Sequence, residues 1–305
     1  MTVPLDSAVL RLKNDVQIPA LGLGTYLISE NQVERALGTA ISAGYRHVDT
    51  AEAYENEKGV GRALAKAFTA GLRRDDMFVT TKLFPGNPGW GLPAKNFGTT
   101  TISLDNSLDR LGLDYVDLYL IHSPMTPSER INQWRGLVEL RDQGKARAIG
   151  VSNYSKIHIE EIRAAGLPLP EVNQIELHPW SQKRELVKYL RENSICVVAY
   201  SSLVPLDTWR TAVGHDSAKT QKMRVSDGTL EKIAKKYQVG EARVLLRWGV
   251  QQGFAVLPKS TVNDRIFENA DLFTFSLDET DMADLAGMER GTPVAWSMGD
   301  PIRLP

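Results

Sequence analysis

Residues 116–151 read VDLYLIHSPMTPSERINQWRGLVELRDQGKARAIGV, and this stretch contains one complete copy of a unit that recurs along the chain. Its two ends, residues 116–121 and 146–151, are short and largely apolar without strict alternation, as expected for parallel strands that are covered on both faces. Residues 129–143 between them have the pattern of a helix, and Gly144 follows at the position where a helix ends. The order of strand, helix and strand predicts one unit of a parallel α/β sheet.

The same unit recurs along the chain. We expect strands at residues 20–23, 45–48, 77–81, 116–121, 146–151, 171–175, 195–200 and 254–257. Helical patterns lie between them, at residues 31–43, 56–70, 101–111, 129–143, 156–165, 181–192 and 226–237. Ser155, Ser181 and Ser226 stand where helix N-caps are expected. Eight β-then-α units without a break in composition predict a single α/β domain over residues 1–305, a (β/α)8 TIM barrel.

The segments outside this repeat have predicted structures of their own. Residues 9–12 and 16–18, around Asn14-Asp15, indicate an N-terminal β-hairpin, and the barrel is expected at about residues 18–275. Two extra helices are predicted at residues 240–252 and 278–288, the second within a C-terminal helix and tail at 276–305. Residues 84–98, 201–225 and 291–305 are predicted to be loops on or near the C-terminal face of the barrel.

The composition excludes several classes of protein. The 305 residues include 36 Lys+Arg and 37 Asp+Glu, so no basic field favours nucleic acid or a membrane surface. A single cysteine and histidines without ligand spacing predict neither a disulfide nor a metal site. The N-terminus lacks the pattern of a signal peptide, and the longest apolar runs are far shorter than the roughly 20 residues of a membrane span. We therefore expect a cytoplasmic protein.

Polar and titratable side chains follow the predicted strands where the apolar runs end. Among them are Asp49, Tyr54, Lys82 and His122, at the end of the barrel where active sites are built. A phenol has an unperturbed pKa of about 10, but a neighbouring ammonium lowers that pKa, and a paired carboxylate keeps the ammonium charged. A histidine beside the phenol can orient a substrate carbonyl. This set predicts protonation of a carbonyl oxygen as hydride arrives at the carbon, and it offers no nucleophile for acyl transfer.

Seven stretches of sequence occur in the order and spacing of one known family. They are GYRHVDTAEAYENEKGVGRAL (44–64), VTTKL (79–83), LDYVDLYLIHSP (113–124), AIGVSN (148–153), NQIELHP (173–179), VVAYS (197–201) and LPKSTVNDRIFEN (257–269). Together they make the chain resemble the aldo-keto reductases from about residue 18 to about residue 288. The resemblance implies a carbonyl-reducing enzyme in which Asp49, Tyr54, Lys82 and His122 form the catalytic tetrad, with Tyr54 as the general acid.

The resemblance also implies a nicotinamide cofactor. The positions matching the family's cofactor-binding residues are Gly24, Thr25, Ser152, Asn153, Gln174, Tyr200, Ser201, Ser202, Leu203, Lys259, Ser260, Thr261, Arg265, Glu268 and Asn269. Of these, Ser152, Asn153 and Gln174 match residues that hold the carboxamide, and Tyr200 matches the ring that stacks on the nicotinamide. The cations Lys259 and Arg265 match the grip on the adenosine 2′-phosphate, which implies NADPH rather than NADH.

The sequence departs from the family pattern around the substrate. Tyr26 stands where tryptophan is common, and His122-Ser123-Pro124 replaces the usual His-Trp-Pro. Trp90 and Trp180 are candidate aromatic walls for the substrate, which we expect to be a small carbonyl compound bound by a monomer.

Two alternative interpretations fit parts of the sequence. Tyr54 and Lys58 also fit the Y-x-x-x-K pattern of short-chain dehydrogenases, but residues 22–24 and 59–61 lack the third glycine of G-x-G-x-x-G. A cofactor-binding sensor or regulatory subunit on the same fold stays open, and it would bind NADPH with little turnover.

Overall fold

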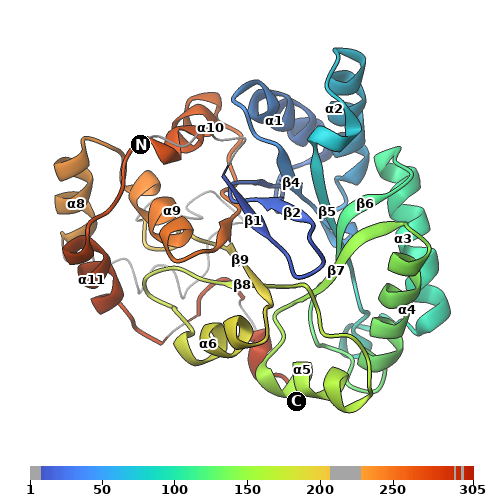
Figure 1. The fold of residues 1–305 in the computed structure, drawn as a ribbon. Helices are drawn as coiled ribbons and strands as arrows, with labels where there is room; N and C mark the ends of the chain where they lie inside the picture. The colour runs from blue at the N-terminus through green and yellow to red at the C-terminus, as the bar shows by residue number, and fades with distance from the viewer. Residues whose placement is uncertain (1–7, 207–227, 292, 297–298) are drawn as a thin grey trace.

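The computed structural model describes residues 8–206, 228–291, 293–296 and 299–305. Eight parallel strands form one sheet in chain order: β3 (Leu23–Gly24), β4 (His47–Asp49), β5 (Phe78–Leu83), β6 (Val116–Ile121), β7 (Ala146–Ser152), β8 (Val172–Glu176), β9 (Cys196–Tyr200) and β10 (Ala255–Val256). Leu21 forms a parallel bridge with Val256, and Gly22 N donates to Val256 O at 3.0 Å. The first and last strands therefore meet, and the predicted (β/α)8 barrel is confirmed (Figure 1).

Helices surround the strands, as Figure 1 shows. They are α1 (Glu30–Ser42), α2 (Glu57–Thr69), α3 (Phe97–Leu111), α4 (Arg130–Asp142), α5 (Lys156–Ala164), α6 (Arg184–Glu192), α8 (Thr229–Tyr237), α9 (Glu241–Gln251), α10 (Asn263–Ala270) and α11 (Glu279–Gly287). The two extra helices of the prediction are α9 and α11. In α1 the buried residues Val33, Leu37 and Ala40 have helical spacing and pack into the layer between helices and strands. A Cβ on Gly59 of α2 would lie 2.2 Å from Glu30 O, so only glycine permits this contact with α1.

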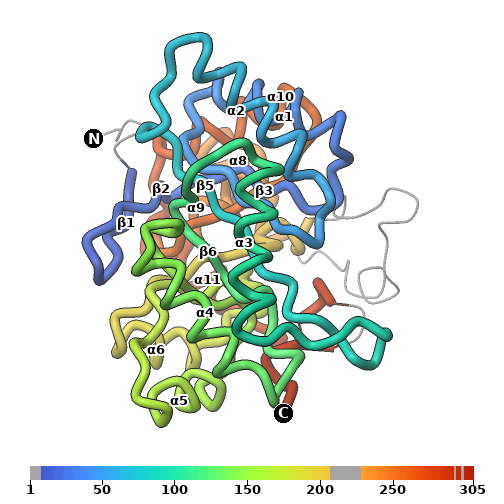
Figure 2. Tube along the Cα trace, turned by 90° about the vertical axis from the view of Figure 1, so that its right-hand side faces the viewer, coloured from blue at the N-terminus to red at the C-terminus, as the bar shows by residue number. Residues whose placement is uncertain are grey.

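The predicted hairpin closes one end of the barrel. Strands β1 (Val9–Arg11) and β2 (Gln17–Pro19) pair antiparallel, with Leu10 opposite Ile18. Ile18 packs with Phe78, Leu118 and Val172 in the interior cluster of the barrel. Figure 2 shows the hairpin at one end of the molecule. Because the hairpin covers the N-terminal ends of the strands, access to the barrel interior is left at the C-terminal ends.

Some boundaries differ from the prediction. Ser155 caps α5 as expected, because its Oγ accepts from His158 N at 3.3 Å. Ser181 is not an N-cap: α6 begins three residues later, after Lys183, which has a φ of 45°. Helix α3 begins at residue 97 rather than 101, because the Asn96 side chain accepts from Thr99 N and caps it earlier. Ser226 and residues 207–225 of the predicted loop lie outside the described residues.

Within the part of the chain that the structure describes, no helix combines the length and apolarity needed to cross a membrane. The same residues contain no group of three or more acidic, histidine or cysteine side chains arranged to hold a metal ion.

Candidate active site

The four residues expected to carry the chemistry meet at the C-terminal end of the barrel. Asp49 is the last residue of β4, Lys82 lies in β5, and His122 directly follows β6. Tyr54 ends the short 3₁₀ turn η2 (Glu52–Tyr54) that comes after β4. Because these three strands are neighbours in the sheet, their ends place the four side chains side by side.

Lys82 is at the centre of this group. Its side chain is fully buried, and its Nζ lies 2.5 Å from Asp49 Oδ1. The same ammonium donates to Thr50 O at 2.8 Å and to Tyr54 Oη at 3.4 Å. An ammonium has three N–H donors, so all three have acceptors here, and one acceptor is the phenol oxygen. A positive charge therefore lies beside the hydroxyl expected to release a proton.

Burial changes the protonation behaviour of Lys82 and His122. Removal from water lowers the pKa of Lys82, and the Asp49 carboxylate opposes this shift. Removal from water lowers the pKa of His122 to about 3, and the Lys82 charge acts in the same direction. His122 is therefore neutral near pH 7, and a neutral imidazole donates a hydrogen bond from one nitrogen only.

Two rings contact the ring of Tyr54. The His122 ring meets the Tyr54 ring edge-on, with the two centroids 5.4 Å apart. The Tyr26 ring lies 5.1 Å from the Tyr54 ring on a tilted plane, and Tyr26 is 46% exposed. Tyr26, the departure from the family pattern, thus offers a solvent-accessible aromatic surface directly beside Tyr54.

The amides expected to hold a carboxamide are connected to the same group. Gln174 Nε2 donates to Asp49 Oδ2 at 2.7 Å, which occupies the carboxylate oxygen that Lys82 does not bind. Ser152 Oγ donates to Gln174 O at 2.9 Å, and Asn153 Nδ2 donates to the backbone oxygen of His122 at 3.1 Å. Asn153 has a φ of 64°, a left-handed conformation that asparagine tolerates better than most residues. Hydrogen bonds thus connect the ends of β7 and β8 to Asp49 and His122.

The other residues expected at the cofactor lie at or directly after the C-terminal ends of β9 and β3. Tyr200 is the last residue of β9, and its Oη donates to Asn153 Oδ1 at 2.7 Å. Ser201, Ser202 and Leu203 follow it directly. Gly24 ends β3, and Thr25 Oγ1 donates to Asp49 O at 3.0 Å.

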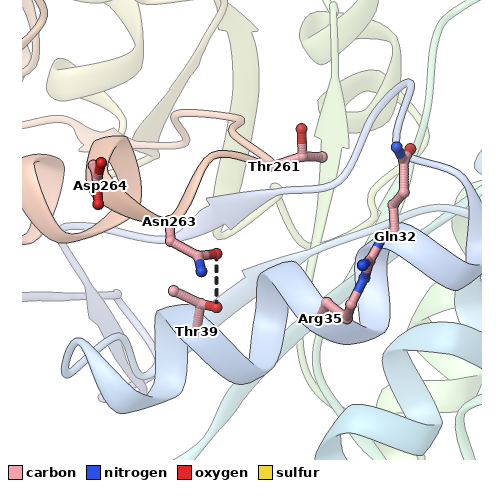
Figure 3. A pocket seen from close by; sticks show the side chains of 6 residues that line it. All are labelled: Gln32, Arg35, Thr39, Thr261, Asn263 and Asp264. Carbon is pink, nitrogen blue, oxygen red and sulfur yellow. Dashed lines mark hydrogen bonds between the residues drawn. The ribbon is translucent and has the colours of Figure 1, made fainter.

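The residues expected at the adenosine end of the cofactor, with Lys259, Ser260 and Arg265 at the 2′-phosphate and Glu268 and Asn269 at the adenine, lie after β10. Lys259, Thr261, Arg265 and Glu268 are exposed, whereas Ser260 and Asn269 are buried. Thr261 lines a hollow of about 720 Å³ between α1 and the start of α10, shown in Figure 3. The other lining residues are Gln32, Arg35, Thr39, Asn263 and Asp264. Thr39 Oγ1 and Asn263 Oδ1 lie 3.2 Å apart across it, so α1 and α10 are joined beside the expected phosphate residues.

Comparisons with known proteins identify the family. The model of the Aldo/keto reductase family matches residues 20–290. The chain belongs to the aldo/keto reductase family. It is 37% identical to morphine 6-dehydrogenase of Pseudomonas putida over 289 residues, which cover 94% of this chain and 93% of that protein. It is 36% identical to glyoxal reductase of Bacillus subtilis over 282 residues, 92% of each protein. A crystal structure of a Bombyx mori aldo-keto reductase in complex with NADP superposes with a TM-score of 0.82 at 33% identity, covering 96% of this chain and 95% of that one.

The polar side chains at this end of the barrel are of the kind that would hold a nicotinamide cofactor. The hydroxyl of Ser152 and the amides of Asn153 and Gln174 are the groups that a carboxamide would bind. Lys259 and Arg265 are two cations suited to a phosphomonoester. These two sets come from β7, β8 and the segment after β10, so they could hold opposite ends of one extended molecule.

The three aromatic residues expected at the substrate have different surroundings. Tyr26 adjoins Tyr54, whereas Trp90 ends the turn η4 (Pro88–Trp90) and is 49% exposed. Trp180 is 3% exposed and packs with Val204 and Val294. Their roles at the substrate stay predictions.

Two residues at this end of the barrel, Glu176 and Lys95, were not predicted from the sequence. Glu176 ends β8 and is 2% exposed, and its Oε1 accepts from Val294 N at 2.7 Å. Lys95 forms an ion pair with Glu52, two residues before Tyr54, and thereby connects the 84–98 loop to η2. A carboxylate within a buried strand was a signal that a partner exists, but the sequence does not say which distant segment supplies it.

Proposed function

We propose that this chain is an NADPH-dependent carbonyl reductase in which Tyr54 gives a proton to the carbonyl oxygen of an aldehyde or ketone. The observation that carries the proposal is the position of Lys82 Nζ, 2.5 Å from Asp49 Oδ1 and 3.4 Å from Tyr54 Oη. The ammonium stabilises the negative charge that remains on the phenol oxygen after the proton leaves. Asp49 holds the ammonium in this position and keeps it charged.

The other groups complete the reduction. When bound, a reduced nicotinamide supplies the hydride that the carbonyl carbon gains. The carbonyl oxygen gains the Tyr54 proton, so the C=O double bond becomes an alcohol. His122, neutral and edge-on to the Tyr54 ring, would donate a hydrogen bond to the same oxygen and fix its direction.

Preference for NADPH over NADH is part of the proposal. Arg265 on α10 and Lys259 before it supply two positive charges beside the expected 2′-phosphate. NADH carries a neutral hydroxyl in place of that phosphate and would gain much less from these charges. The NADP in the crystal structure of the Bombyx mori relative supports this choice.

The substrate is proposed only as a class. One relative is named for morphine and another for glyoxal, at 37% and 36% identity, so overall similarity does not select a substrate. The exposed Tyr26 beside Tyr54 supports a small carbonyl compound with an apolar or aromatic part. We further propose that the chain works as a monomer in the cytoplasm.

The test is NADPH consumption by the purified chain with a panel of activated aldehydes, alongside NADPH binding measured without substrate. We expect binding and aldehyde-dependent oxidation together. Tight binding with no turnover on any aldehyde would favour a sensor or regulatory subunit. Absence of binding would contradict both functions.

A further inference from the structure

A chain of hydrogen bonds runs from the C-terminal tail to the backbone of His122. Trp296 Nε1 donates to Tyr200 Oη at 2.9 Å, and Tyr200 Oη donates to Asn153 Oδ1 at 2.7 Å. Asn153 Nδ2 in turn donates to His122 O at 3.1 Å. These residues come from the tail and from the ends of β9, β7 and β6. The tail is therefore bonded directly to Tyr200, the ring expected to stack on the nicotinamide.

The hydroxyl of Tyr200 acts both as a hydrogen-bond acceptor and as a hydrogen-bond donor. It accepts one hydrogen bond from Trp296 and donates one to Asn153. Burial raises the pKa of Tyr200 well above its usual range, so the hydroxyl keeps the proton that it donates. Two bonds at the tip of the side chain, from different elements, limit rotation of the ring about its side-chain bonds.

The segment carrying Trp296 is itself held on the barrel. Glu176, at the end of β8, accepts from Val294 N at 2.7 Å and from Ala295 N at 3.0 Å. His178 Nε2 lies 2.9 Å from the same carboxylate, which is 2% exposed. Because a buried carboxylate without partners is costly, these bonds favour the docked tail. Further along, Lys183 and Asp300 form an ion pair at 2.6 Å, with both side chains about one-tenth exposed.

We propose that Trp296 is a positioning residue for the nicotinamide: its bond to Tyr200 Oη holds the stacking ring in place, so the docked tail sets cofactor affinity. This inference rests on the proposed function, because it takes Tyr200 to be the stacking residue. A ring fixed before binding loses less conformational freedom when the cofactor arrives. Loss of the Trp296 bond should therefore weaken NADPH binding even though Trp296 is not expected to touch the reacting atoms.

The test is a double-mutant cycle of Trp296→Phe, Tyr200→Phe and the double variant, with the Kd of NADPH measured in the absence of substrate. Trp296→Phe keeps an aromatic ring and removes the N–H, and we expect it to raise the Kd by about 2- to 10-fold. In the Tyr200→Phe background the acceptor is gone, so the same substitution should then change the Kd little. Equal losses in both backgrounds would show that Trp296 acts by packing alone and would overturn the proposal.

Three controls keep the outcomes separate. Arg303→Ala, an exposed tail residue in η6 (Pro301–Arg303), should leave the Kd of NADPH unchanged. Thermal unfolding of each variant shows whether the fold is retained, and Tyr200→Phe tests the same bond from its other side. Failure of the wild-type chain to bind NADPH would contradict the proposed function. Normal wild-type binding with no coupling in the cycle would contradict this inference alone.

Discussion

Lys82 and Asp49 form an ion pair inside the barrel, with Nζ and Oδ1 2.5 Å apart and side chains 0% and 5% exposed. Removing one partner of a buried pair leaves the other charge without compensation, at a cost of about 3–5 kcal/mol. We therefore expect Asp49→Asn to lower the free energy of unfolding by an amount in this range. Urea denaturation of the purified variant measures it.

The matched variant is the double substitution Asp49→Asn with Lys82→Met, which removes both charges. It should be more stable than Asp49→Asn alone, because no uncompensated ammonium remains buried. The single variant Lys82→Met completes the comparison. If the double variant lost as much unfolding free energy as the two single variants together, the charges would not interact as the geometry indicates.

Arg265 tests the adenosine end of the site. Arg265→Met removes a cation from the expected 2′-phosphate, so the Kd of NADPH should rise by roughly tenfold or more, since bonds to charged groups are the stronger class. The Kd of NADH should change far less. Titrations with both cofactors measure the difference.

A second exposed arginine is the control for the loss of one positive charge from the protein as a whole. Arg135 on α4 is exposed and far along the chain from the residues expected at the 2′-phosphate. Arg135→Met should leave the Kd values of NADPH and NADH near those of the wild type. A uniform loss of NADPH and NADH affinity in Arg265→Met would mean that Arg265 does not contact the phosphate.

His47 gives a prediction for acid stability. It is 1% exposed, with Nε2 3.1 Å from Thr80 Oγ1, and burial lowers its pKa to about 4. An unfolded histidine has a pKa of about 6.5, so between about pH 6.5 and 4 the unfolded chain binds one more proton at this residue than the folded chain. The free energy of unfolding should therefore fall as the pH falls through this window, by about 1.4 kcal/mol per pH unit for this residue.

His47→Gln removes the titrating group and keeps a side chain that can bond Thr80. Its unfolding free energy, measured by urea denaturation at several pH values between 6 and 4.5, should depend less steeply on pH than that of the wild type. The same slope in both proteins would show that His47 is protonated in the folded chain.

The sequence was enough to predict the barrel and the central residues because both follow short-range rules. The apolar runs mark the strands, and the position after each run marks the C-terminal end of the barrel, where Asp49, Lys82 and His122 lie. Tyr54 belongs to the same polar segment after the second predicted strand, and the structure places it on a turn rather than on a strand. The family match over residues 20–290 confirms the resemblance.

Contacts between distant segments could not be predicted in this way. Glu176 binds Val294 and Ala295, more than a hundred residues away. Lys95, within the 84–98 loop, pairs with Glu52 on the turn after β4. No spacing rule relates such partners, because each contact depends on how a loop or tail folds back over the barrel. The helix start at residue 184 was missed for a related reason, since Ser181 pairs with His178 instead of capping α6.

Single-turnover reduction of an aldehyde by NADPH-bound protein measures whether the Tyr54 hydroxyl gives the proton. Tyr54→Phe keeps the ring between His122 and Tyr26 and removes only the hydroxyl. We predict an unchanged Kd for NADPH and a single-turnover rate about 10²- to 10⁴-fold lower than that of the wild type. A rate close to that of the wild type, with NADPH bound equally well, would show that another group gives the proton.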